Sequence, residues 1–168
     1  MARDELAPLR AYLQARTTLT LATCSGGRPW ACSLFYACDR DCRLYFVSDA
    51  GTLHSRHIAE NPQVAVTVSG QALDWLDIDG VQLVATAALL EGAQRRRAEQ
   101  CYLERFPQIA AMRDRPASAQ ERSIADRLLG GGFYCLTPSW ARVIDNRQGF
   151  GHKLEIALTP APAACARS

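Results

Sequence analysis

The sequence predicts a mainly β (α+β) domain, built as a small antiparallel barrel of six to seven strands with peripheral helices. Short alternating or β-branched segments recur along the 168 residues, and turn residues separate them. Most of the predicted strands are also neighbours in sequence, unlike the regular strand–helix alternation of a doubly wound sheet. Because 48% of the residues are hydrophobic, a chain of this length can bury the core of one domain.

The first predicted element is a helix over residues 4–16, in which Asp4 caps the first turn and leucines share one face. Three short strands joined by tight turns follow, and we expect them to form an antiparallel meander. These strands comprise residues 17–24, 29–38 and 43–48.

The remaining elements mix strands with inserted helices. A short helix over residues 53–60 is stopped by Asn61-Pro62. The later strands are predicted at 63–69, 80–91, 133–145 and 153–158, and the later helices at 93–106, ended or bent by Pro107, and from the capping residue Ser118 onward.

For two segments the sequence allows more than one structural role. Strand 80–91 is largely apolar on both faces, so we expect either helices or a second subunit to cover its outer face. Residues 113–132 are interpreted as a lid, a dimer arm or a floppy insertion. The domain is expected to span residues 1–158, and the tail 159–168, rich in Ala and Pro, is expected to be disordered.

Composition excludes several classes of function. The formal net charge is +2, and the sequence contains no long basic stripe or acidic tail. Neither nucleic acid nor a membrane surface is therefore expected as a partner. No apolar run approaches the ~20 residues of a membrane span, and residues 1–16 lack an apolar signal-peptide core. We therefore expect a soluble, cytoplasmic protein.

The seven cysteines are interpreted as reduced thiols, because their number is odd and no CxxC pair occurs. Cys38 and Cys42 flank a turn, but no histidine lies at ligand spacing. Asp74, Asp77 and Asp79 lack the spacing of a calcium loop. No metal site is predicted.

The segment that carries chemistry is a strand, loop and helix over residues 44–68. The N-terminus of the predicted helix offers unpaired N–H groups and a positive dipole end, to which the hydroxyls of Ser48 and Thr52 add donors. His54 and Arg56 add donor or cationic contacts. The segment predicts a phosphate cradle; the alternative is that Thr52 only caps the helix and the histidines lie on its surface.

This segment, together with residues 27–36 (GRPWACSLFY) before it, resembles the flavin-phosphate region of pyridoxamine 5′-phosphate oxidase-like proteins. The chain is most similar to the YhbP-like family within them, over about residues 9–158. The matching features are Trp30, Phe35-Tyr36, Thr52-x-His54, Gly80-Val81-Gln82, Tyr102-x-x-Arg105-Phe106-Pro107, Asp145-Asn146 and Gly149-Phe150-Gly151-x-Lys153.

The resemblance implies a split β-barrel that binds FMN. Ser48 and Thr52 occupy the positions of phosphate-binding hydroxyls, and Val47 precedes them at the strand end. His54 stands where the superfamily often has lysine, and Leu53 where the oxidase has arginine, so the cationic grip on a phosphate is weakened. Ser33 and Phe35 lie on the strand that runs beneath the flavin ring in relatives.

The late loop 149–153 is open to two readings. Its glycines let the backbone approach a ligand closely, and Lys153 supplies charge, so Phe150 and Lys153 are candidate cofactor contacts. Alternatively the loop is a tight turn with Phe150 as a core plug. The resemblance implies a homodimer with the flavin at its interface, so this loop could serve the partner subunit's site.

The function implied is that of an FMN-dependent oxidoreductase acting on an unknown small molecule. One alternative is a non-enzymatic flavin- or ligand-binding dimer. Another is a haem-binding split barrel with His54, His57 or His152 as ligand, and a deazaflavin is a further cofactor candidate. No catalytic residue is assigned, and vitamin B6 oxidation is not expected because a C-terminal tryptophan-and-arginine pattern is missing.

Overall fold

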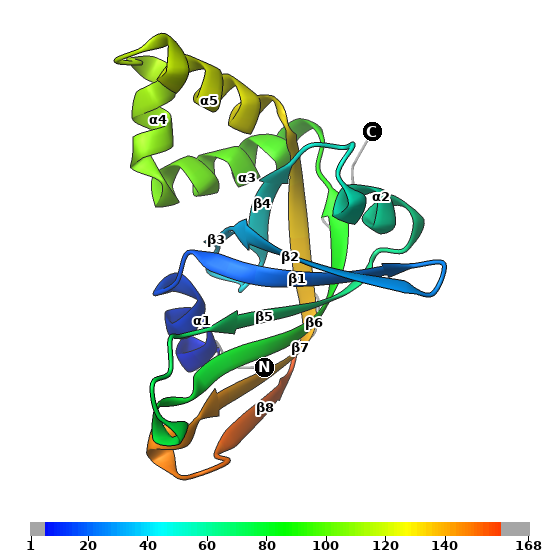
Figure 1. Ribbon diagram of the computed structural model, residues 1–168, viewed down its shortest axis with the longest axis vertical. Helices are drawn as coiled ribbons and strands as arrows, with labels where there is room; N and C mark the ends of the chain where they lie inside the picture. The colour runs from blue at the N-terminus through cyan, green and yellow to red at the C-terminus, as the bar shows by residue number, and fades with distance from the viewer. Residues whose placement is uncertain (1–5, 159–168) are drawn as a thin grey trace.

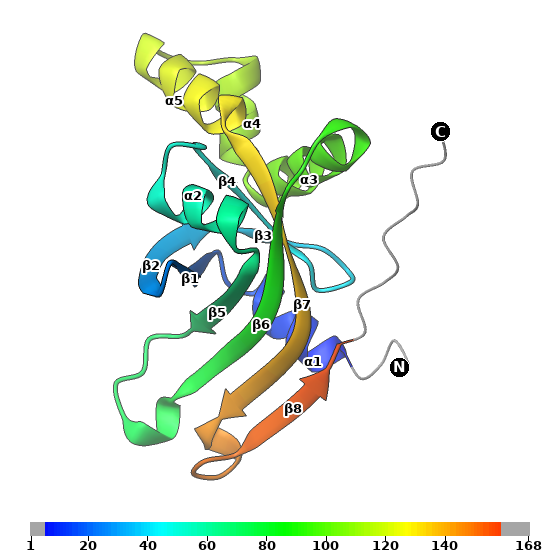
Figure 2. The same ribbon diagram turned by 90° about the vertical axis from the view of Figure 1, so that its right-hand side faces the viewer.

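A computed structural model describes residues 6–158, which form one curled antiparallel sheet with helices at its margins (Figures 1 and 2). The predicted split β-barrel is confirmed. The strands are β1 (Thr18–Ser25), β2 (Arg28–Phe35), β3 (Ala37–Cys38), β4 (Leu44–Ser48), β5 (Gln63–Ser69), β6 (Asp79–Leu89), β7 (Gly132–Asp145) and β8 (Lys153–Ala157). The helices are α1 (Ala7–Gln14), α2 (Leu53–Glu60), α3 (Gly92–Arg105), α4 (Pro107–Asp114) and α5 (Ala119–Gly130).

The strand order is β2–β1–β5–β6–β7–β4–β3, and β8 pairs with the second half of β7. The 14-residue strand β7 is the longest element of the sheet and pairs with β6 on one side. On its other side it pairs first with β4 and then with β8. β7 therefore joins the two ends of the molecule (Figure 2).

The expected meander of three strands is wrong in its second half. The hairpin of β1 and β2 forms, with Gly26 and Gly27 at φ +54° and +75°, a conformation that favours glycine. The chain then leaves this hairpin at Tyr36, whose buried hydroxyl donates to the carbonyl of Leu13 at 2.6 Å. The next strand pairs are β3 with β4 and β4 with β7, and no ladder forms between β2 and β4 among the described residues.

No backbone ladder joins β2 to β4 within residues 6–158, so the barrel is open between them. We call this opening the seam. Its two borders are the free edge of β2 and the C-terminal end of β4, and helix α2 lies close to it. The seam is the place where side chains rather than backbone hydrogen bonds must connect the sheet.

Two apolar clusters lie on opposite faces of β4. Leu44 and Phe46 point into the barrel with the valines of β5, whose alternation the sequence predicted. Tyr45 points to the other face and joins Tyr102 and Phe106 of α3. Helix α3 therefore covers the outer face of β4 and the start of β7 (Figure 1).

The insertion between β6 and β7 consists of the helices α3, α4 and α5. Pro107 ends α3, as expected, but it also opens α4, which was not predicted; proline is tolerated at the first helical position. Ser118 caps α5 by accepting from the N–H of Glu121 at 3.2 Å. Residues 113–132 thus include all of α5, so most of the segment is helical.

The outer face of β6 is exposed. Burial alternates along the strand, and Val84 and Leu89 are 46% and 51% exposed. Among residues 6–158 no helix covers this face, so only the second subunit remains as the predicted cover. Asp4 and the tail 159–168 lie outside the described residues, and α1 begins at Ala7 without a side-chain cap. None of the described helices combines the length and apolar character that crossing a bilayer requires.

Candidate functional site

The turn between β4 and α2 is held by its own side chains. Thr52 caps the helix, its Oγ1 accepting from the N–H of Ser55 at 3.4 Å. The Asp49 carboxylate accepts from the N–H of Gly51 at 2.6 Å, and the carbonyl of Asp49 accepts from the Thr52 hydroxyl at 2.9 Å. The first turn of α2 is therefore presented in one conformation beside the seam.

Ser48, Thr52 and His54 form one hydrogen-bonded cluster. The His54 Nε2 atom lies 2.6 Å from Ser48 Oγ and 3.1 Å from Thr52 Oγ1, and these two oxygens are 3.1 Å apart. On the other side of the ring, His54 Nδ1 lies 3.4 Å from the Sγ atom of Cys32 on β2. His54 therefore bridges the seam from β4 to β2.

Both histidines of α2 are buried, so the interpretation that placed them on the helix surface is wrong. His54 and His57 are each 7% exposed. The ring of His57 faces β1, with Nδ1 3.1 Å from Thr23 Oγ1. The interpretation of Thr52 as a cap is correct, but the same hydroxyl also belongs to the cluster.

His54 acts as a neutral hydrogen-bonding group. Burial lowers the pKa of His54, and the nearby His57 lowers it further. Burial also raises the pKa of the facing Cys32 thiol. Both shifts favour the uncharged side chain, so His54 is not favoured as the cation for a phosphate.

The start of α2 has donors free for an anion. Among residues 6–158, no acceptor pairs with the backbone N–H groups of Leu53 and His54. A cleft of about 560 Å³ opens at the residues just before them, Gly51 and Thr52. It is lined by Asp49, Gly51, Thr52, Asp126, Arg127, Gly130 and Gly131.

A second cleft, of about 390 Å³, lies on the other side of α2, against the hairpin of β1 and β2. It contains two exposed arginines, Arg28 and Arg56, and Glu60, which accepts from the Ser25 hydroxyl. The full lining is Ser25, Gly26, Arg28, Leu53, Arg56, His57 and Glu60.

The β2 residues expected beneath a flavin lie near the cluster but outside it. Ser33 and Phe35 point to the exposed face of the edge strand, and Phe35 packs edge-on against Phe106 with ring centroids 5.8 Å apart. Cys32, which sequence reasoning missed, points inward to His54. The period-two alternation of a strand separates positions 32 and 33 and was the signal that would have selected Cys32.

Val47 lies on the opposite face of β4 from Ser48. Its side chain is half-buried against the cluster under α3, and a Cβ at Gly131 would come within 3.0 Å of it. Val47 thus supports the end of β4 by packing, and its side chain faces away from Ser48.

Phe150 and Lys153 are far from the cluster within one chain. Ser48 pairs with Gly132 at one end of β7, and Lys153 pairs with Ile144 at the other. At about 3.3 Å per residue these ends are separated by roughly 40 Å along the strand. Phe150 is 77% exposed, so its interpretation as a core plug is wrong.

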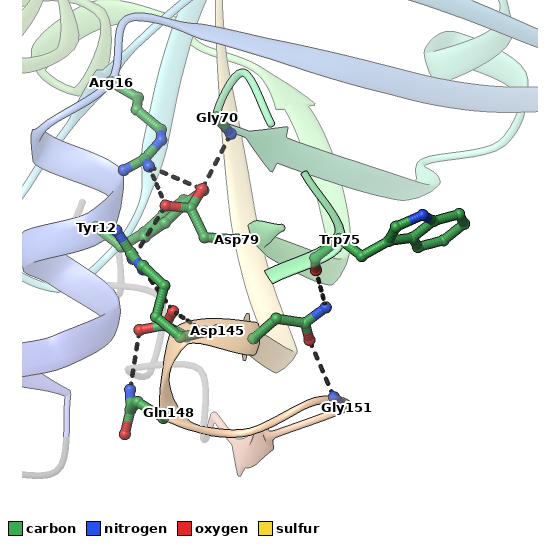
Figure 3. Close-up of polar contacts among 10 residues, drawn as sticks. Tyr12, Arg16, Gly70, Trp75, Asp79, Asp145, Gln148 and Gly151 are labelled. Atoms are coloured by element: carbon green, nitrogen blue, oxygen red, sulfur yellow. Dashed lines mark hydrogen bonds and ion pairs between the residues drawn. The ribbon is translucent and has the colours of Figure 1, made fainter. Parts of the chain in front are cut away.

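The loop that carries Phe150 is nevertheless held in place (Figure 3). Asn146 donates to the carbonyl of Trp75 at 2.7 Å and accepts from the N–H of Gly151 at 3.0 Å. Hydrogen bonds from Arg147 and Gln148 lower the pKa of Asp145 to about 2. An exposed aromatic side chain is therefore presented from a braced loop.

The same region is tied to the first helix through Asp79 (Figure 3). Its carboxylate accepts from the Tyr12 hydroxyl at 2.5 Å, from Arg16 at 2.9 Å and from the N–H of Gly70 at 3.2 Å. Burial and this hydrogen bond raise the pKa of Tyr12. Asp79 thus connects α1, β6 and the loop before it. Within residues 6–158 no group of three or more His, Cys, Asp or Glu side chains is arranged for a metal ion.

Comparison with known proteins places this geometry in context. The family model described as pyridoxamine 5′-phosphate oxidase matches residues 7–129. A UPF0306 protein of Photorhabdus laumondii is 29% identical over 150 residues, which are 85% of this chain and 89% of that protein.

Solved structures share the fold at low identity. A Clostridium acetobutylicum protein of the pyridoxinephosphate oxidase family has a TM-score of 0.60 and 13% identity, covering 94% of this chain and 97% of its own. A heme binding protein from Mycobacterium smegmatis has a TM-score of 0.65 and 19% identity, covering 94% of this chain and 58% of its own. These likenesses concern the fold alone.

Proposed function

Because this chain belongs to the pyridoxamine 5′-phosphate oxidase-like split-barrel family, we propose that it binds FMN with the phosphate at the N-terminus of α2. The observation that carries the proposal is the Ser48–Thr52–His54 cluster beside the unpaired N–H groups of Leu53 and His54. Helix N-termini with hydroxyl donors favour phosphate over neutral ligands.

The donors present fit a phosphate. Two backbone N–H groups supply hydrogen bonds, and the Ser48 hydroxyl, which His54 orients, is proposed to add a third; the Thr52 hydroxyl donates to the Asp49 carbonyl and holds the turn in shape. Since the burial of His54 favours its neutral form, this histidine holds donors in place rather than neutralising charge. We expect an affinity weaker than that of a site with lysine and arginine at these positions.

The flavin ring is proposed to lie over β2, where Ser33 and Phe35 are exposed. Their side chains leave the seam and face outward, so they offer a surface rather than a closed pocket. Completion of the site then requires a second copy of the chain. Phe150 and Lys153, which are exposed and remote from their own chain's cluster, are proposed to serve the partner's site in a homodimer.

When bound, FMN supplies hydride and electron transfer. The proposed activity is therefore that of an oxidoreductase acting on a small molecule. The chain is proposed to anchor the phosphate, position the ring and exclude water. No described side chain at the cluster is free to act as a general acid or base, because both nitrogens of His54 are within hydrogen-bonding distance of a side chain. Oxidation of NADH or NADPH by the FMN-loaded protein, with turnover, separates this activity from flavin binding without catalysis.

FMN binding is tested by quenching of flavin fluorescence. Saturable quenching is expected for FMN, and its absence at high micromolar concentration would refute the proposal. The double variant Thr52→Ala, His54→Ala should weaken FMN at least tenfold and riboflavin little, because only FMN carries the phosphate. Thr67→Ala, an exposed threonine on β5, is the matched control. Equal loss of both ligands would reject the phosphate assignment.

Haem binding is the second candidate, favoured by the fold shared with a heme binding protein. His54 and His57 are buried, so His152, which is exposed beside Phe150, is the candidate ligand. Titration with haem should give a Soret band that His152→Ala abolishes if this candidate is correct. If the Soret band persists in the variant, His152 is not the ligand. If the unaltered chain gives no Soret band, haem binding is refuted.

A further inference from the structure

The C-terminal end of α5 packs directly against the end of β4. A Cβ at Gly131 would come within 3.2 Å of the Ser48 carbonyl oxygen, and one at Gly132 within 3.3 Å of the same atom. Contacts this short are tighter than most Cβ contacts in proteins, so a side chain at either position would force its neighbours to shift. The helix end is therefore fitted to the strand end that carries Ser48, next to the first turn of α2.

This contact forms one wall of the cleft of about 560 Å³, opposite the Asp49–Thr52 turn. Thr52 contributes its hydroxyl from one wall, and Arg127 lies on the other, in the last turn of α5. Thr52, the residue that caps α2 and belongs to the cluster, and the Arg127 guanidinium group thus line one cavity. Arg127 is the one cation among the residues that line it.

We propose that Arg127 binds the phosphate of FMN and supplies the positive charge that Leu53 and His54 do not. The inference rests on the proposed function and deepens it. A guanidinium group suits a phosphate because its N–H groups match the geometry of two phosphate oxygens. The helix α5 then has a function: it carries the cation to a site whose own loop lacks one.

The other charges of the cleft limit the affinity. Asp49 already accepts from the N–H of Gly51, and Asp126 stands beside Arg127 on α5. Both carboxylates oppose an anion, so neutralising Asp126 should tighten FMN binding. An increase in FMN affinity on neutralising Asp126 distinguishes a phosphate in the cleft from a ligand held elsewhere.

The test is a fluorescence titration of the full chain with FMN and with riboflavin. Arg127→Gln should weaken FMN roughly tenfold or more and leave riboflavin within about twofold. Asp126→Asn should strengthen FMN. Arg122→Gln, an exposed arginine on the same helix outside the cleft lining, is the matched control and should change neither ligand. Far-ultraviolet circular dichroism checks that each variant is folded.

The outcomes separate the two proposals. If the unaltered chain does not bind FMN, the proposed function fails and the role of Arg127 fails with it. If it binds FMN and Arg127→Gln binds equally well, FMN binding stands and the role of Arg127 is refuted. If Arg127→Gln loses FMN and riboflavin alike, the arginine does not act on the phosphate, and the inference is again refuted. Should Arg127→Gln be unfolded, the Asp126→Asn titration decides, and unchanged or weaker FMN binding refutes the inference.

Discussion

Replacing Asp79 by asparagine is expected to destabilise the chain strongly, although the residue is far from the Ser48–Thr52–His54 cluster of its own chain. The carboxylate is 9% exposed and accepts from Tyr12 at 2.5 Å, from Arg16 at 2.9 Å to each oxygen, and from Gly70 at 3.2 Å. Asparagine keeps the size but removes the charge and turns an amide N–H₂ toward donors. One oxygen can still accept, while at least one donor is left without a partner.

The magnitude follows from burial. Breaking a fully buried ion pair costs about 3–5 kcal/mol, whereas an exposed pair contributes about 0–1 kcal/mol. The Arg16 side chain is 25% exposed, between these limits, and the second ion pair to Arg147 is mostly exposed, at 58% for the arginine. We therefore expect a loss of about 2–3 kcal/mol in the free energy of unfolding.

Urea denaturation followed by circular dichroism measures this loss. With a slope of about 1–3 kcal/mol per molar urea, the midpoint should fall by roughly 1 M. Asp77→Asn, two residues earlier and exposed, is the control and should stay within about 0.5 kcal/mol. A loss below about 0.5 kcal/mol for Asp79→Asn would show that the network is formed without net stabilisation, and the reasoning would be wrong.

Two further predictions concern stability. Because burial lowers the pKa of His54 in the folded chain, the histidine is protonated at a higher pH in the unfolded chain than in the folded one. The stability that the neutral, buried His54 contributes is therefore present above the unfolded pKa of ~6.5 and is lost as the pH falls below that value. His54→Gln should therefore show a smaller fall in Tm between pH 7 and pH 5, and an equal fall would contradict the buried, neutral assignment. Phe46→Ala, at a fully buried ring stacked 4.9 Å from Tyr134, should cost about 3–5 kcal/mol, whereas Phe150→Ala should stay within about 0.5 kcal/mol in urea denaturation; similar losses would contradict the exposed position of Phe150.

Much of the local structure follows from short-range signals in the sequence. The alternating valines of β5 fix one face of that strand, and Asn61-Pro62 ends α2, so both elements have their predicted bounds. Thr52 and Ser118 were assigned as caps from residue type and position alone. Such features depend on neighbours within a few residues, which periodicity and capping preferences describe.

The failures come from contacts between distant residues. Tyr36 follows the last residue of β2, and its hydroxyl donates to the carbonyl of the distant Leu13, a partner that no local pattern encodes. The pairing of β4 with β7 joins segments separated by the whole helical insertion. Likewise Cys32 and Arg127 reach the neighbourhood of Thr52 only through the folded sheet, so sequence reasoning identified the hydroxyls of the site but neither of these two side chains.

The seam has a consequence for how this fold can diverge. Across a closed barrel, a change in the spacing of two strands requires a new hydrogen-bond register for both. Here no ladder joins β2 to β4 among residues 6–158, and Cys32, His54 and Ser48 span the opening, so a substitution at these positions removes no backbone ladder. The side chains that span the opening can therefore differ between proteins of this fold without a new pairing of strands.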